Sequence, residues 1–121
     1  MRISFQADAD LDEDIIWGVK RIDPMINFQT ADEAGIRGLK DSVVLKTAAI
    51  ENKILVSHDR RTMPRHFADF ILDQTSPGVF IISQSAKISE VIDDLFLVWF
   101  ASETEEWINV ISELPFPKKF R

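Results

Sequence analysis

Short apolar segments alternate with longer segments of helical periodicity along this chain. Four of the short segments predict strands, over residues 2–7, 26–30, 53–57 and 79–82. Between and after them the pattern predicts helices over about 12–21, over 43–52, from 59 or 62 onward, and over 88 to about 111. Strands that alternate with helices in this way are typical of βαβ units.

We therefore expect one α/β domain over residues 1–121. Its three layers would be a mostly parallel central sheet of about four strands with helices on both faces. The segment 31–38 carries two glycines and is predicted as a loop. The pattern predicts no fifth strand.

Composition narrows the class of protein without naming a function. The 121 residues are 45% hydrophobic, which suits a single globular domain. No apolar segment approaches the roughly 18 residues that would predict a membrane span, and no secretory signal is visible. The absence of cysteine excludes disulfides and zinc–thiolate sites. We expect a cytoplasmic protein that is not a membrane protein.

Charge is unevenly distributed along the chain. The net charge of −6 argues against a protein that coats nucleic acid through a basic surface. Acidic residues crowd positions 8–14, whereas basic residues crowd positions 60–66. An acidic site with basic flanks is compatible with an enzyme that contacts nucleic acid locally.

Carboxylates recur where the predicted strands end. Asp8 and Asp10 follow the first strand, Asp59 follows the third, and Asp41 begins the helix after the second. The carboxyl ends of parallel strands share one edge of a sheet, which is where α/β proteins bind ligands. Converging carboxylates favour a bound cation, and oxygen ligands suit Mg²⁺ or Mn²⁺. The pattern predicts a metal site for phosphodiester hydrolysis.

Each of these residues also has a structural interpretation. Asp41 is an ordinary helix N-cap, and Asp8 and Asp59 could be turn residues. Asp10 could cap a helix or support the site from outside the metal ligands. Ser57 lies two residues before Asp59, so it points to the same side and could hydrogen-bond a carboxylate or simply end the strand. The metal site is favoured because three separate structural explanations would otherwise coincide on one edge.

The basic residues after the third strand have two interpretations as well. Arg60, Arg61 and Arg65 could contact substrate phosphate, because guanidinium matches phosphate geometry, or they could form a solvated helix start. His58 and His66 are too few and too far apart to predict a metal-binding pair.

These residues resemble the PIN-like nuclease family, in particular a compact bacterial branch related to the toxin ribonucleases of toxin–antitoxin modules. The similarity lies in residues 5–11 (Phe-Gln-Ala-Asp-Ala-Asp-Leu), 34–45, 54–60 (Ile-Leu-Val-Ser-His-Asp-Arg) and 76–79. It spans most of the chain, to about Trp107.

The resemblance implies that Asp8, Asp41 and Asp59 hold Mg²⁺ or Mn²⁺ and cleave RNA. It also implies a possible toxin role with an antitoxin partner, and a homodimer, for which Leu97 and Phe100 offer apolar surface on the last helix. The family usually assembles four acidic groups, and Arg61 stands where related sequences often have an aspartate. Asp10 is the candidate replacement.

Two other functions stay open. One is a catalytically inactive PIN-like interaction protein, which Arg61 and the acidic charge favour. The other is a receiver-type phosphoacceptor domain, with Asp59 as the acceptor. The absence of a predicted fifth strand, followed by a lysine that would contact the phosphoryl group, argues against the receiver.

Overall fold

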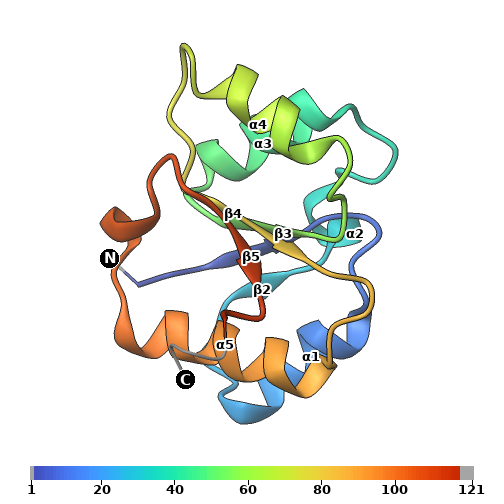
Figure 1. Cartoon of the computed structure of the whole chain (residues 1–121), viewed down its shortest axis with the longest axis vertical. Helices are drawn as coiled ribbons and strands as arrows, with labels where there is room; N and C mark the ends of the chain where they lie inside the picture. Colours follow the sequence, from blue (N-terminus) through green and yellow to red (C-terminus); the bar gives the residue numbers. More distant parts are fainter. Residues whose placement is uncertain (1, 118–121) are drawn as a thin grey trace.

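The computed structural model describes residues 2–117 as an α/β fold on one five-stranded, all-parallel sheet (Figure 1). The strands lie in the order β2-β1-β3-β4-β5. Their bounds are β1 Phe5–Ala7, β2 Phe28–Gln29, β3 Ile54–Ser57, β4 Val79–Ile82 and β5 Ile111–Leu114. The predicted parallel α/β architecture is therefore confirmed, with one strand more than expected.

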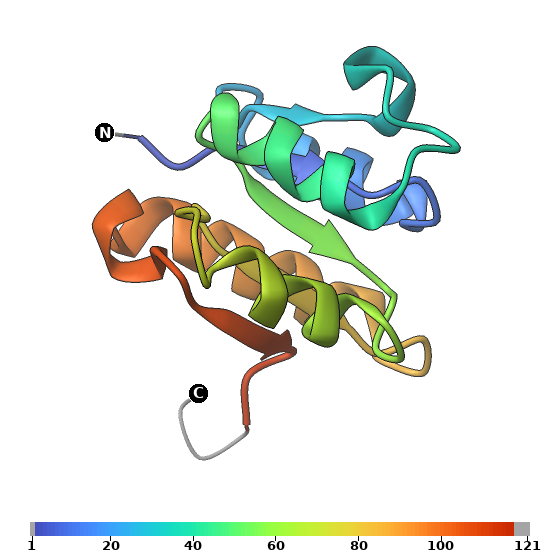
Figure 2. The same ribbon diagram turned by 90° about the horizontal axis from the view of Figure 1, so that it is seen from above.

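Helices cover both faces of the sheet. On one face, α1 (Glu13–Ile22) packs against α5 (Ile88–Ala101). On the other, α3 (Asp41–Ile50) lies beside α4 (Met63–Phe70), as the turned view in Figure 2 also shows. Within residues 2–117, no helix combines the length and the hydrophobicity needed to cross a membrane.

The strands divide the core into two clusters, because alternate side chains of a strand point to opposite faces of the sheet. In β4, Phe80 and Ile82 pack in the cluster that includes residues of α1 and α5. Val79 and Ile81 pack in the cluster that includes residues of α3 and α4. β3 follows the same rule. Both faces of the central strands are buried, which explains why these strands are continuously apolar.

The segment 31–38, predicted as a loop, contains a one-turn helix, α2 (Ala31–Ala34). Thr30 caps it: Thr30 Oγ1 accepts from Glu33 N at 3.1 Å, and Glu33 Oε1 accepts from Thr30 N at 2.8 Å. Gly35 ends the helix in the left-handed conformation, with φ of +68°.

The last helix ends well before Ile111, where the prediction placed its end. Ser102 leaves the helix with extended backbone, and its Oγ donates to Val98 O at 2.6 Å. The Trp107 indole then donates to Ser102 Oγ at 2.9 Å. These bonds hold the chain as it turns away from the helix, so the apolar residues that follow belong to other elements.

The residues beyond this turn form β5, the strand that the sequence pattern did not predict. A 3₁₀ turn, η1 (Thr104–Trp107), precedes it, and Trp107 packs edge-on against Phe80 with ring centroids 5.0 Å apart. β5 is an edge strand with one fully buried residue, Leu114. Its apolar pattern is therefore weak, and the expectation that no fifth strand exists was wrong.

Two glycines with positive φ allow a test of this packing. An added Cβ at Gly78 (φ +120°) would lie 2.8 Å from Trp107 O, whereas at Gly35 it would meet no described atom within 4 Å. We expect Gly35→Ala to lower the free energy of unfolding by about 1 kcal/mol, from backbone strain alone. Gly78→Ala adds a main-chain collision, and we expect about 3 kcal/mol. Urea denaturation measures the free energy of unfolding of both variants. Equal losses would show that the main chain of η1 moves aside without cost.

Candidate functional site

The strand order places a crevice at the carboxyl ends of β1 and β3. The chain goes from β1 to β2 on one side and then to β3 on the other, so strand order reverses between β1 and β3. α/β sheets bind ligands at such a reversal. Asp8 follows β1 directly and Asp59 lies two residues beyond β3, so both predicted residues border this crevice.

Asp8 is tied to β3 through the buried side chain of Ser57. Ser57 Oγ donates to Asp8 Oδ2 at 2.7 Å, and Ala9 N donates to Asp8 Oδ1 at 2.9 Å. The Asp8 amide donates to Val56 O at 2.9 Å, which extends the ladder between the strands. Ser57 is only 1% exposed, so this hydroxyl is fixed inside the fold.

The same hydroxyl positions the start of the loop after β3. Asp59 N donates to Ser57 Oγ at 3.0 Å. The Asp59 carboxylate accepts from Thr62 N at 2.9 Å and also from Thr62 Oγ1. Burial alone would raise the pKa of Asp59, but the hydrogen bonds from Thr62 and neighbouring amides outweigh it, so this pKa lies below its usual value.

Asp41 is not the N-cap of its helix, so the capping interpretation was wrong. The cap is Lys40, which makes no side-chain capping hydrogen bond, and Asp41 is the first helical residue. Its Oδ2 lies 3.3 Å from Thr62 Oγ1 and 3.4 Å from His66 Nε2. Thr62 therefore stands between two of the predicted carboxylates.

These contacts form one continuous series of hydrogen bonds, Asp8–Ser57–Asp59–Thr62–Asp41, in which Asp59 contacts Ser57 through its main-chain amide and Thr62 through its carboxylate. A pocket of about 170 Å³ is lined by Asp8, Asp10, Ser57, His58, Asp59 and Gln84. Asp41 is not among its lining residues. The structure thus gathers Asp8, Asp10 and Asp59 around one pocket and leaves Asp41 beside α4.

Asp8 carries its charge in an unfavourable setting. Burial raises the pKa of Asp8 above the ordinary value of 3.8, and the hydrogen bonds from Ser57 and Ala9 only partly offset this. The negative charges of Asp41 and Asp10 raise the pKa further. A cation bound beside Asp8 would relieve both the desolvation and the repulsion.

The donor set fits a hydrated divalent ion rather than one fully enclosed by side chains. Among residues 2–117, no three His, Cys, Asp or Glu side chains converge closely enough to hold one ion. Mg²⁺ keeps several waters and takes only one or two carboxylates directly, and the pocket beside Asp8 leaves space for water. Asp8 would bind directly, with Asp10 and Asp59 as the neighbouring ligands or water acceptors.

His58 joins two segments next to this pocket. Its Nδ1 lies 3.0 Å from Ile82 O at the end of β4, and its Nε2 accepts from Asp12 N at 3.3 Å. This pattern requires a neutral ring with the proton on Nδ1. His58 therefore acts here as a connector between β4 and the turn before α1.

The three predicted substrate arginines do not cluster at the pocket. Arg60 forms an ion pair with Glu113 of β5. Arg61 and Arg65 are exposed. None of the three lines the pocket that contains Asp8 and Asp59.

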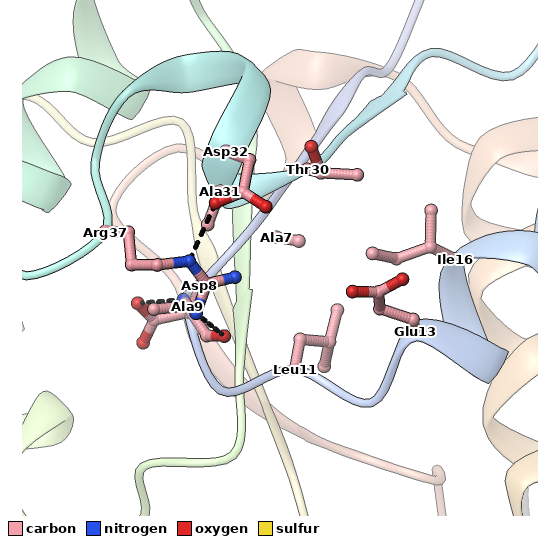
Figure 3. Close-up of a pocket in the computed structure, with 10 residues that line it drawn as sticks. All are labelled: Ala7, Asp8, Ala9, Leu11, Glu13, Ile16, Thr30, Ala31, Asp32 and Arg37. Atoms are coloured by element: carbon pink, nitrogen blue, oxygen red, sulfur yellow. Dashed lines mark hydrogen bonds and ion pairs between the residues drawn. The ribbon is translucent and has the colours of Figure 1, made fainter.

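Arg37 adjoins the site although the sequence pattern did not point to it. Asp8 also lines a second pocket, of about 100 Å³, and Arg37 lines this pocket together with Asp32, Thr30 and Glu13 (Figure 3). The only signal was an arginine between two glycines, in a segment predicted as a loop. The proximity of Arg37 to Asp8 depends on the parallel pairing of β1 with β2, which local sequence does not reveal.

Comparison with protein-family models, with curated proteins and with solved structures finds no match to this chain. The resemblance to PIN-like nucleases therefore stays a prediction, and the chemistry of the site is argued from its geometry.

Asp8→Asn tests the unfavourable setting of the carboxylate. The folded-state pKa of Asp8 is raised above the unfolded-state value, so its ionisation destabilises the fold as the pH rises through the folded-state pKa. We expect Asp8→Asn to raise the urea midpoint at pH 7 and this gain to shrink as the pH falls toward 3.8. The measurement is made in EDTA. The exposed Asp73→Asn is the control for one lost charge, and a lower midpoint for Asp8→Asn would show that the charge stabilises the fold.

Proposed function

We propose that this protein is a metal-dependent nuclease of PIN-like type that hydrolyses RNA phosphodiesters at the crevice between β1 and β3. The observation that supports it best is the half-buried Asp8, hydrogen-bonded through Ser57 to the loop of Asp59 and sharing a pocket with Asp10. A fold retains such an arrangement at a cost in stability, and perturbed carboxylates in a cleft are typical of functional sites.

In the proposed mechanism, Asp8 is the principal ligand and its geometry is set by Ser57. Mg²⁺ or Mn²⁺, when bound, supplies Lewis-acid activation of the phosphodiester and of water. Asp10 and Asp59 accept hydrogen bonds from water at the pocket. Water oxygen forms a bond to phosphorus as the water releases a proton to solvent, one ester P–O bond breaks, and the leaving oxygen takes a proton from solvent. Asp41 contributes negative charge from the α3 side, held near Asp59 through Thr62.

Cleavage of labelled single-stranded RNA in the presence of Mn²⁺ tests this function. We expect Asp8→Asn to lower the rate at least about 100-fold, because the variant has one ligand carboxylate fewer and binds the ion poorly. Asp73→Asn, which removes a carboxylate outside the site, is the matched control and should cleave normally. EDTA should abolish cleavage by the wild-type protein. Cleavage that persists in EDTA or in Asp8→Asn would refute the mechanism.

The receiver alternative gains one specific observation from the fold. The five strands lie in an order that several ligand-binding α/β classes share, and Asp59 lies after β3 at the strand reversal. Lys118 and Lys119, the lysines that follow the fifth strand in the sequence, lie outside the described residues. Against it, both Asp59 oxygens already accept hydrogen bonds from Thr62.

Acetyl phosphate separates the two functions. A nuclease of the proposed type should take up no phosphoryl group from acetyl phosphate, because its Asp59 does not act as a phosphoacceptor. One phosphoryl group per chain, absent in Asp59→Asn and retained in Asp73→Asn, would establish the receiver function instead. Intact-mass measurement detects the label. The inactive interaction protein would show neither labelling nor cleavage.

The remaining partner predictions are part of the same proposal. Leu97 and Phe100 of α5 are 51% and 69% exposed, which leaves an apolar surface available for a second copy of the chain. Self-association, a toxin role and an antitoxin partner stay predictions.

A further inference from the structure

A short turn fixes Arg37 beside the acidic edge. Gly35 and Gly38 both have positive φ, +68° and +81°, and Ile36, which directly precedes Arg37, is buried in the cluster with α3 and α4. Ile36 N donates to Ala31 O at 3.1 Å, and Ile36 O accepts from the amide three residues later. The backbone on both sides of Arg37 is therefore anchored, so its side chain leaves the turn in a defined direction.

The guanidinium of Arg37 lies over the residue that follows Asp8. Its Nε donates to Asp32 Oδ1 at 2.7 Å, and its Nη1 donates to Ala9 O at 3.4 Å (Figure 3). Ala9 in turn donates its amide to Asp8 Oδ1. The main chain of a single residue, Ala9, thus connects Arg37 to the proposed metal ligand.

Arg37 retains donors for a further partner. A guanidinium has five N–H groups in a planar fork, and the hydrogen bonds to Asp32 and Ala9 use Nε and Nη1. Among the described residues, no hydrogen bond of Nη2 is found. The Arg37 side chain is 54% exposed, so these donors are open to solvent. The planar fork of a guanidinium matches the oxygen atoms of phosphate and of carboxylate groups.

Arg37 is also the one Lys or Arg among the described residues that line the two pockets to which Asp8 belongs. The remaining charged lining residues are acidic: Asp8, Asp10, Glu13, Asp32 and Asp59. A polyanion that approaches such an edge needs a cation at the point of contact, because carboxylates repel phosphate. Arg60, by contrast, is drawn toward β5 by its ion pair with Glu113.

We propose that Arg37 binds a non-bridging phosphate oxygen of single-stranded RNA that lies across Asp8. This role rests on the proposed nuclease function for its substrate class, but it concerns binding and needs neither metal nor turnover. Asp32 holds the guanidinium in place, and Nη2 faces the phosphate. The RNA backbone then passes from the pocket of Arg37 to the pocket of Asp10 and Asp59, with Asp8 between them.

Fluorescence polarisation of a labelled, unstructured 12-nucleotide RNA in EDTA and low salt tests the role of Arg37. We expect Arg37→Gln to weaken binding about 10-fold. The slope of log affinity against log salt should become shallower by about 0.7, because the variant neutralises one phosphate fewer on a single strand. Arg37→Lys keeps the positive charge but lacks the planar guanidinium, so it should bind RNA with an affinity between those of the wild type and Arg37→Gln.

Arg21→Gln is the matched control. Arg21 is exposed in the last turn of α1, roughly 12 Å along the helix from Glu13, which lines the Arg37 pocket. Arg21→Gln removes one positive charge, as Arg37→Gln does, but at a position away from the crevice. The affinity for RNA and the slope of log affinity against log salt should therefore stay at wild-type values. Urea midpoints of all variants show that each is folded, and Arg37→Lys carries the test if Arg37→Gln does not fold.

Three outcomes would overturn the role of Arg37: unchanged binding by Arg37→Gln, equal weakening in Arg21→Gln, or no RNA binding by the wild-type protein. EDTA separates this result from the nuclease proposal. Arg37-dependent binding by a protein that never cleaves RNA with Mn²⁺ would support the role of Arg37 and refute the nuclease. If the protein cleaves RNA with Mn²⁺ but Arg37→Gln binds RNA as tightly as the wild type, the nuclease proposal is supported and the role of Arg37 is refuted.

Discussion

The hydrogen bond from Ser57 Oγ to Asp8 Oδ2 is the interaction on which the organisation of the candidate site depends. It joins the ends of β1 and β3, the two strands between which the order of the sheet reverses. Because the same hydroxyl accepts from the Asp59 amide, one buried serine sets both the carboxylate and the loop opposite it. The hydroxyl can play both parts since it has one donor and two acceptor positions. Without it, Asp8 would be a buried carboxylate with a single amide donor, a costly arrangement.

Around this hydrogen bond, the edge of the sheet concentrates negative charge that the fold itself does little to neutralise. The nearby arginines each form an ion pair: Arg37 pairs with Asp32 through Nε, which leaves Nη2 open, and Arg60 pairs with Glu113. The carboxylates differ in consequence. Asp59 is stabilised as an anion by Thr62, whereas burial opposes the charge of Asp8. A cation bound beside Asp8 would offset the burial that opposes the negative charge of this carboxylate.

The packing below the edge explains why it can tolerate this charge. Alternate side chains of β3 and β4 enter separate clusters on the two faces, so the central strands are held from both sides. Burial of the apolar side chains in these clusters supplies most of the stability of the fold, and this offsets the cost of the negative charge at the site. β5 closes one side of the sheet through Leu114, and the preceding η1 packs Trp107 against Phe80. Glu113 of β5 forms an ion pair with Arg60, which does not line the pocket of Asp8 and Asp59.

The sequence by itself determined the central strands and the residues at their carboxyl ends. Continuous apolar segments can be buried only as central strands here, and the right-handed crossover of βαβ units sends their ends to one edge. The positions of Asp8, Ser57 and Asp59 follow from that rule. Tertiary structure alone decided the end of α5, the edge strand β5, the pairing of Asp41 with Thr62 rather than with its own helix, and the place of Arg37. Each of these depends on an interaction between residues distant along the chain or on a partly exposed edge, where local periodicity carries little information.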